Sequence, residues 1–126
     1  MKIRNLTTKK DITETTEIAR SSLRKALGLM FRSGLKRGHG LLMEFTKPSK
    51  YAYSIWMLGM RFPIDIIFIG PDKKVTDVFE NVPPLSFRSS TWRVYSPTKP
   101  VKWIVEVSAG MARKSGTSVG DRLIFD

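Results

Sequence analysis

The chain has 126 residues, 41% of them hydrophobic, which fits one globular domain large enough to bury a core. It has no cysteine and a single histidine, so disulfides, thiolate catalysis and Cys- or His-rich metal sites are excluded. The formal net charge of +11 favours an anionic partner over a cationic one.

The basic residues are concentrated in the first part of the chain. Residues 1–50 contain 12 Lys and Arg against 4 Asp and Glu, whereas residues 51–126 contain 10 against 7. They are scattered singly and in pairs rather than gathered in a long run. A solvated basic surface therefore explains them more simply than nucleic-acid binding, which stays open as an alternative.

The sequence contains no signal for a membrane. No segment approaches the roughly 18 consecutive apolar residues of a membrane helix, and residues 1–10 lead into no apolar core of a signal peptide. We expect a soluble, cytoplasmic protein without membrane contact. Glutamine is absent and asparagine occurs only at positions 5 and 81, while Lys and Arg are abundant, which favours a thermophilic source.

The first third of the chain alternates between strand and helix patterns. Residues 12–19 alternate in polarity and are rich in Thr, which predicts a strand. After a serine pair at 21–22, apolar residues in 23–30 recur at helical spacing, so a short helix is expected there. A basic loop at 33–40 then leads into a strand at 41–46.

The middle of the chain holds its longest apolar run. Residues 51–58 alternate as a strand, and Gly59 and Pro63 bracket an irregular link after it. Residues 64–69 are apolar at every position except Asp65, which predicts a strand buried on both faces. The elements expected beyond it are a turn at 70–73, strands at 74–80, 85–96, 101–107 and 122–125, and a helical turn at 109–114.

These elements predict a mainly β fold. We expect a single domain over residues 1–126, built as a mostly antiparallel β-sandwich or small barrel with two short helices. No βαβ crossover appears long enough to favour a parallel sheet. Residues 1–10 are expected to form either a flexible basic arm or an edge strand.

Four groups of residues, in this order, resemble the motifs of the family called domain of unknown function 192. They are Gly28-Leu29-Met30-Phe31-Arg32; Trp56-Met57 with Pro63-Ile64-Asp65-Ile66-Ile67-Phe68-Ile69; Glu106-Val107 with Ala109-Gly110; and Gly120-Asp121. The resemblance covers roughly residues 15–125. It implies a compact single-domain β-sandwich-like fold, and it implies no activity because none is established for the family.

Asp65 is the most informative polar residue, because an ionised carboxylate inside an apolar strand needs a partner. Arg61 and Arg32 are the expected partners, since arginine binds a carboxylate through two hydrogen bonds. The simplest interpretation is a structural salt bridge that fixes the link at 59–63. The functional interpretation is that Arg61, Asp65 and Trp56 line a pocket for a small polar or anionic ligand.

Glu106 and Asp121 are the candidate second carboxylates. Asp65 with Glu106 could serve a hydrolase or transferase, although a turn-stabilising hydrogen bond explains Asp121 without function. Asp65, Glu106 and Asp121 could also surround an oxygen-liganded cation, but no spacing requires this, and we expect neither metal nor cofactor.

Other chemistries find little support. The methionines could offer thioethers to a soft metal, but their spacing is more typical of core residues; they are Met30, Met43, Met57 and Met60. His39 lies between two glycines in a loop without an evident acid partner, and no serine-nucleophile or phosphate-loop motif is present.

Three functions therefore remain open. The preferred one is a non-enzymatic binding module with a ligand cleft near Trp56, Arg61 and Asp65, with Arg32 and Asp121 as further candidates for the same concavity. The second is nucleic-acid binding by the basic N-terminal half, with Trp92 and Tyr95 as stacking platforms. The third is the hydrolase or transferase that uses Asp65 with Glu106.

Overall fold

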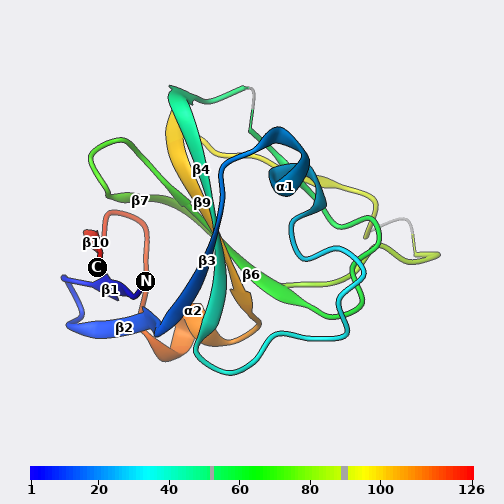
Figure 1. Cartoon of the computed structure of the whole chain (residues 1–126), viewed down its shortest axis with the longest axis horizontal. Coiled ribbons are helices and arrows are strands. Elements are labelled where there is room, and N and C mark those ends of the chain that lie inside the picture. The colour runs from blue at the N-terminus through cyan, green and yellow to red at the C-terminus, as the bar shows by residue number, and fades with distance from the viewer. Residues whose placement is uncertain (52, 89–90) are drawn as a thin grey trace.

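The computed structural model describes residues 1–51, 53–88 and 91–126 (Figure 1). The elements in chain order are β1 (Ile3–Asn5), β2 (Lys10–Thr13), β3 (Thr15–Ala19), α1 (Ser22–Leu27), β4 (His39–Ser49), β5 (Ile55–Trp56), β6 (Ile64–Ile69), β7 (Val75–Val82), β8 (Val94–Tyr95), β9 (Val101–Ser108), α2 (Met111–Lys114) and β10 (Leu123–Phe125). In the described part of the chain, neither helix is long and apolar enough to cross a membrane.

A five-stranded sheet in the order β3-β4-β9-β6-β7 forms the centre of the molecule. A three-stranded sheet, β10-β1-β2, packs on one side of it, and Figure 1 shows α1 on the other side. A two-stranded sheet of β5 and β8 completes the α1 side. The fold is therefore mainly β and mostly antiparallel with two short helices, as the sequence predicts.

The central sheet separates two cores. The first core, on the α1 side, consists of Ala19, Leu29, Leu41, Met43, Phe45, Ile55, Met57, Ile64, Ile66, Phe68, Val82, Tyr95, Val101 and Ile104. The second core, under the small sheet, consists of Ile3, Ile12, Leu42, Ile67, Ile69, Val75, Trp103, Val105, Val107 and Leu123.

Strand β6 contributes to both cores because successive side chains of a strand point to opposite faces. Ile66 and Phe68 enter the first core, and Ile67 and Ile69 enter the second. All six residues of β6 are buried, which confirms the strand predicted at 64–69. Each large apolar side chain buried in this way stabilises the fold by about 1.5–3 kcal/mol.

The two ends of the chain lie together in the small sheet. β1 is the middle strand, paired with β2 and β10, and Ile3 is fully buried. Lys2 and Asp126 exchange backbone hydrogen bonds of 3.1 and 2.8 Å, so the N- and C-termini are neighbours (Figure 1).

One strand pair departs from the expected topology. β3 and β4 are parallel, with Thr15 opposite His39 and Ala19 opposite Met43. The connection through α1 and the basic loop is long enough for a βαβ crossover, so the expectation that none exists was wrong. The strand predicted at 12–19 is in fact two, because the chain leaves the small sheet at Glu14 and enters the central one.

Two predicted strands are much shorter than expected. Of 51–58, only β5 forms, and of 85–96, only β8; residues 52 and 89–90 lie outside the described residues. Gly59 turns the chain at a φ of 75°, with room for no side chain because a Cβ would lie 2.5 Å from Met30 Cγ. In the second segment, Thr91 Oγ1 accepts a hydrogen bond of 2.8 Å from Ser86 N, which closes a loop instead of a strand.

Candidate functional site

A cavity of about 170 Å³ opens between α1 and β5. Residues 25–30 form one wall. The other wall consists of Ser54, Ile55, Trp56, Leu58 and Met60. Met43 of β4 and Glu106 of β9 complete the lining. We call this cavity the Glu106 pocket, because Glu106 supplies its one carboxylate.

Glu106 is buried on the first-core face of the central sheet, with 3% of its surface exposed. Its Cα is paired in register with Leu41 on one side and Ile66 on the other, so its sheet neighbours are apolar. In the part of the chain that the structure describes, Glu106 Oε1 is the one buried side-chain oxygen or nitrogen without a hydrogen-bond partner. Burial raises the pKa of this carboxyl to about 7, against a smaller lowering by the positive charge of Arg32.

The turn after α1 lies directly against this carboxylate. α1 ends at Gly28, whose φ is 51° and whose N–H donates to the Arg24 carbonyl at 3.0 Å. A Cβ on Gly28 would lie 3.0 Å from Glu106 Oε1 and 3.2 Å from Met43 Cε. Gly28 is thus both the end of the helix and a close-packing point, because only glycine combines this φ with this approach.

Trp56 lies at the opening of the pocket, with 52% of its surface exposed. It belongs to β5 and is paired with Val94 of β8. Lys25 also lines the pocket, but its Nζ donates to the Glu44 carbonyl at 3.1 Å and lies 4.4 Å from the centre of the Phe45 ring. The Lys25 ammonium group therefore interacts with Glu44 and Phe45 of β4.

Asp65 lies outside the Glu106 pocket, and its carboxylate accepts hydrogen bonds from backbone N–H groups. Its Oδ1 accepts from Asn81 N at 2.8 Å, and its Oδ2 accepts from Gly110 N at 3.0 Å and Ala112 N at 2.8 Å. The predicted Arg–Asp65 salt bridge was wrong, because β6 runs beside β9 and brings Asp65 to the chain that enters α2. Asp65 is fully buried, and three N–H donors replace the expected guanidinium.

The other predicted site residues are dispersed. Arg32 Nη1 binds Glu17 Oε2 at 2.7 Å, and Arg61 is exposed without an ion pair among the described residues. Asp121 Oδ2 accepts from Asn5 Nδ2 and from Ser118 N, both at 2.9 Å. Of the five residues predicted for one concavity, Trp56 alone lines the Glu106 pocket, and Arg32 acts on Glu106 through its charge.

Asp65 and Glu106 cannot act on one substrate. Asp65 is opposite Val107 in the β6–β9 register, and Glu106 is opposite Ile66, so their side chains leave opposite faces of the sheet. Asp65 is on the side of the second core and Glu106 on the side of the first. The predicted pairing of these carboxylates in a hydrolase or transferase was therefore wrong.

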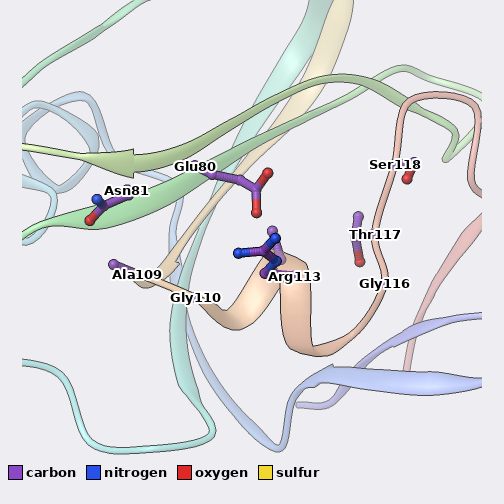
Figure 2. A pocket seen from close by; sticks show the side chains of 9 residues that line it. Glu80, Asn81, Ala109, Gly110, Arg113, Gly116, Thr117 and Ser118 are labelled. Atoms are coloured by element: carbon purple, nitrogen blue, oxygen red, sulfur yellow. The ribbon is translucent and has the colours of Figure 1, made fainter.

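A larger open pocket of about 680 Å³ lies next to the donors that hold Asp65. Figure 2 shows the side chains of Glu80 and Arg113 reaching into it. These two charges are opposite in sign, and the N–H groups at the start of α2 already bind Asp65. Among the described residues that line this pocket, no buried side-chain nitrogen or oxygen lacks a hydrogen-bond partner, in contrast to the Glu106 pocket.

A third pocket, of about 640 Å³, is basic. Its lining includes Lys9 from the β1–β2 turn, Lys10 at the start of β2, Arg37 from the loop before β4 and Lys114 from α2, together with Arg4, Asp11 and Glu14. Arg4 binds Asp11 at 3.0 Å and the Lys9 carbonyl at 2.8 Å. The fold thus gathers cations that are far apart in the sequence, and we call this the basic pocket.

Comparison with known proteins places the chain in a family. Residues 4–125 match the family model for domain of unknown function 192, described as an uncharacterized ACR. The chain belongs to this family. A UPF0127 protein of Pyrococcus furiosus is 34% identical over 119 residues, 94% of this chain and 93% of that protein. A UPF0127 protein of Pyrococcus abyssi is 30% identical over 107 residues, 85% of this chain and 82% of that protein.

Two solved structures share the fold. One, from Sinorhizobium meliloti 1021, is named as a proposed transcription regulator; its TM-score is 0.81 at 26% identity, over 98% of this chain and 89% of that one. The other is a protein of unknown function from Novosphingobium aromaticivorans DSM 12444, with a TM-score of 0.80 at 25% identity, over 98% and 82%. The two UPF0127 relatives come from thermophilic archaea, the kind of source that the composition predicts for this chain.

The sequence pattern contains the same kind of signal at Glu106 as at Asp65. Both are single carboxylates in apolar strands, and alternation correctly puts Glu106 on the face opposite Trp103 and Val105. The pattern could not show which of the two carboxylates accepts hydrogen bonds from backbone N–H groups. That depends on which backbone N–H groups the fold brings to each face.

Proposed function

We propose that the chain is a binding module for a small ligand that carries a hydrogen-bond donor, held in the Glu106 pocket. The observation that carries the proposal is the buried Glu106 Oε1 without a donor among the described residues. Buried polar atoms in native proteins are satisfied with few exceptions, and an exception at a cavity points to a ligand. An unmatched buried acceptor costs about 1–3 kcal/mol, more if charged, which a ligand donor would offset.

The lining of the pocket supports a small ligand. Leu29, Met43 and Ile55 give it apolar walls, and the exposed Trp56 offers a large aromatic surface at the opening. Ligand sites in proteins combine such apolar walls with a small number of polar groups that fix orientation.

The Glu106 pocket shares Trp56 with the cleft predicted from the sequence but has a different polar residue. Trp56 remains, but Glu106 takes the place of Asp65 as the polar group, and Arg61 lines no part of the pocket. An anionic ligand is disfavoured beside Glu106, because two like charges repel strongly where water is excluded. The motifs of the family resemblance that begin at Gly28, Trp56 and Glu106 all contribute lining residues, which supports the same place.

Titration with small donor-bearing compounds, followed by methionine-methyl NMR spectra, tests the proposal. Propanamide, 1-butanol and n-butylammonium are suitable probes, and we expect the methyl signals of Met43 and Met60 to shift more than that of Met111, which packs against the second core. In the Glu106→Gln variant, the probe-induced shifts of these methyl signals should differ from those of wild type. In Glu80→Gln, which changes an exposed carboxylate as a control, the shifts should match those of wild type. If no probe shifts Met43 or Met60 selectively, the chain is not a binding module of this kind.

Nucleic-acid binding is a second candidate, favoured by the basic pocket. Lys9, Lys10, Arg37 and Lys114 form no ion pair among the described residues, so their charges are free to meet phosphates. The structural relative from Sinorhizobium meliloti that is named as a proposed transcription regulator adds support. Tyr95 does not suit the predicted stacking role because it is 5% exposed, whereas Trp92 is 62% exposed.

Fluorescence polarisation with duplex DNA over a salt series tests this second candidate. The double variant Lys10→Ala/Lys114→Ala should weaken binding and flatten its salt dependence. The control Lys47→Ala/Lys99→Ala removes the same charge from two exposed positions outside the pocket. Equal losses in both variants would mean that net charge alone, and not the basic pocket, attracts DNA.

A further inference from the structure

The Glu106 pocket contains a negative group whose neighbouring cations are engaged elsewhere. Arg32, whose charge acts on Glu106, is bound to Glu17 at 2.7 Å. Lys25 is directed to the Glu44 carbonyl at 3.1 Å. The lining residues that β4 and β5 contribute carry no charge. The ionised Glu106 is therefore left without a cation of its own in the described part of the chain.

We propose that the natural ligand of this pocket is a small primary ammonium compound with an aliphatic body. This inference rests on the proposed function and names its ligand class. An ammonium group carries three donors and a positive charge, so it satisfies Glu106 Oε1 and compensates the buried carboxylate together. A neutral amide or alcohol would supply the hydrogen bond but leave the charge uncompensated.

The walls and dimensions of the pocket suit the aliphatic body. Met43 and Ile55 offer flexible and branched apolar contacts, and the Trp56 ring at the opening can attract a cation or cover a hydrocarbon chain. The cavity of about 170 Å³ has room for on the order of six water-sized groups. A second cavity of about 170 Å³ adjoins it, shares Lys25, Met43 and Ile55, and continues toward Phe45, so a longer chain can follow.

The carboxylate also gives this ligand class a pH signature. Because burial raises the pKa of Glu106 to about 7, the Glu106 carboxyl is mostly protonated at pH 6 and mostly ionised at pH 8 when no ligand is bound. An ammonium binds the ionised form, so its affinity should rise about tenfold over this interval. A neutral alcohol of the same length has no reason to follow this profile.

The experiment compares n-butylammonium, 1-butanol and butyrate by the same methionine-methyl NMR titration at pH 6 and pH 8. At pH 8 we expect n-butylammonium to bind at least about tenfold more tightly than 1-butanol, a difference of about 1.4 kcal/mol, and butyrate to bind most weakly. In Glu106→Gln the preference for the ammonium and its pH dependence should both disappear. Glu80→Gln should retain both.

The outcomes separate the two proposals. If 1-butanol binds as tightly as n-butylammonium at pH 8, or if Glu106→Gln keeps the ammonium preference, the ammonium assignment is wrong while the binding module stands. If no donor-bearing probe occupies the pocket, the proposed function itself falls. Should Glu106→Gln fail to fold, Trp56→Ala at the exposed opening is the second variant, and unchanged ammonium affinity in it contradicts the proposal.

Discussion

Gly28 and Glu106 meet across the pocket so closely that a Cβ on the glycine would lie 3.0 Å from the carboxylate oxygen Oε1. The two residues are far apart in the sequence, one at the end of α1 and one in β9. The helix end therefore fixes how much space remains beside the carboxylate.

Glu106 should make the stability of the protein fall as the pH rises. Its pKa is about 7 in the folded state against 4.5 as the reference, so the folded state holds the proton more tightly and stability is lost between about pH 4.5 and pH 7. In Glu106→Gln this loss should be absent. The free energy of unfolding of the variant minus that of wild type should therefore be larger at pH 8 than at pH 5, by on the order of 2 kcal/mol. Urea unfolding at both pH values measures the difference, and an equal difference at the two would contradict it.

Gly28→Ala should both destabilise the fold and close the pocket. The new methyl group would press against Glu106 Oε1 and Met43 Cε in a backbone with a φ of 51°, so we expect a loss of about 1–3 kcal/mol. Binding of n-butylammonium should also be lost in the fraction that remains folded. Gly120→Ala is the matched control, because Gly120 also has a positive φ, of 92°, while a Cβ there meets no atom within 4 Å.

Asp65→Asn should destabilise the chain without affecting the Glu106 pocket directly. The amide cannot accept from all three N–H groups that now bind the carboxylate, so a loss of about 2–4 kcal/mol is expected. Hydrogen exchange should become faster at Gly110 and Ala112, the donors at the entry to α2. Asp126→Asn, an exposed position, controls for the change of charge; unchanged exchange at Gly110 would count against this role of Asp65.

Asn5→Asp should destabilise the small sheet in a pH-dependent manner. Asn5 Nδ2 donates to Asp121 Oδ2 at 2.9 Å and to Thr117 Oγ1 at 3.2 Å, and Asn5 is fully buried. A carboxylate in its place would face that of Asp121, with a loss of about 2–4 kcal/mol at pH 7. Protonation should relieve part of this repulsion, so thermal unfolding at pH 4 should show a smaller loss than at pH 7, and an equal loss would argue against charge repulsion.

The sequence pattern predicted those parts of the fold that depend on local periodicity. β6 at 64–69 follows from its apolar run, and the faces of Glu106 and Asp65 follow from strand alternation. The short helix predicted within 23–30 corresponds to α1, which spans Ser22–Leu27. The parallel pairing of β3 with β4, the break at Glu14 and the short β5 and β8 did not follow, because each depends on contacts between segments distant in the chain.

Periodicity and motifs alone predict a mainly β chain of one family, with Asp65 inside an apolar strand, Glu106 in an alternating strand and a tryptophan ahead of the link at 59–63. Which of the two carboxylates borders a cavity depends on the tertiary structure. Asp65 faces the backbone N–H groups at the entry to α2 and is satisfied, whereas Glu106 faces a cavity beside Gly28. A backbone N–H satisfies a buried carboxylate only where the fold places the two groups side by side. Strand alternation specifies the face of a side chain but not which N–H groups of other segments lie there.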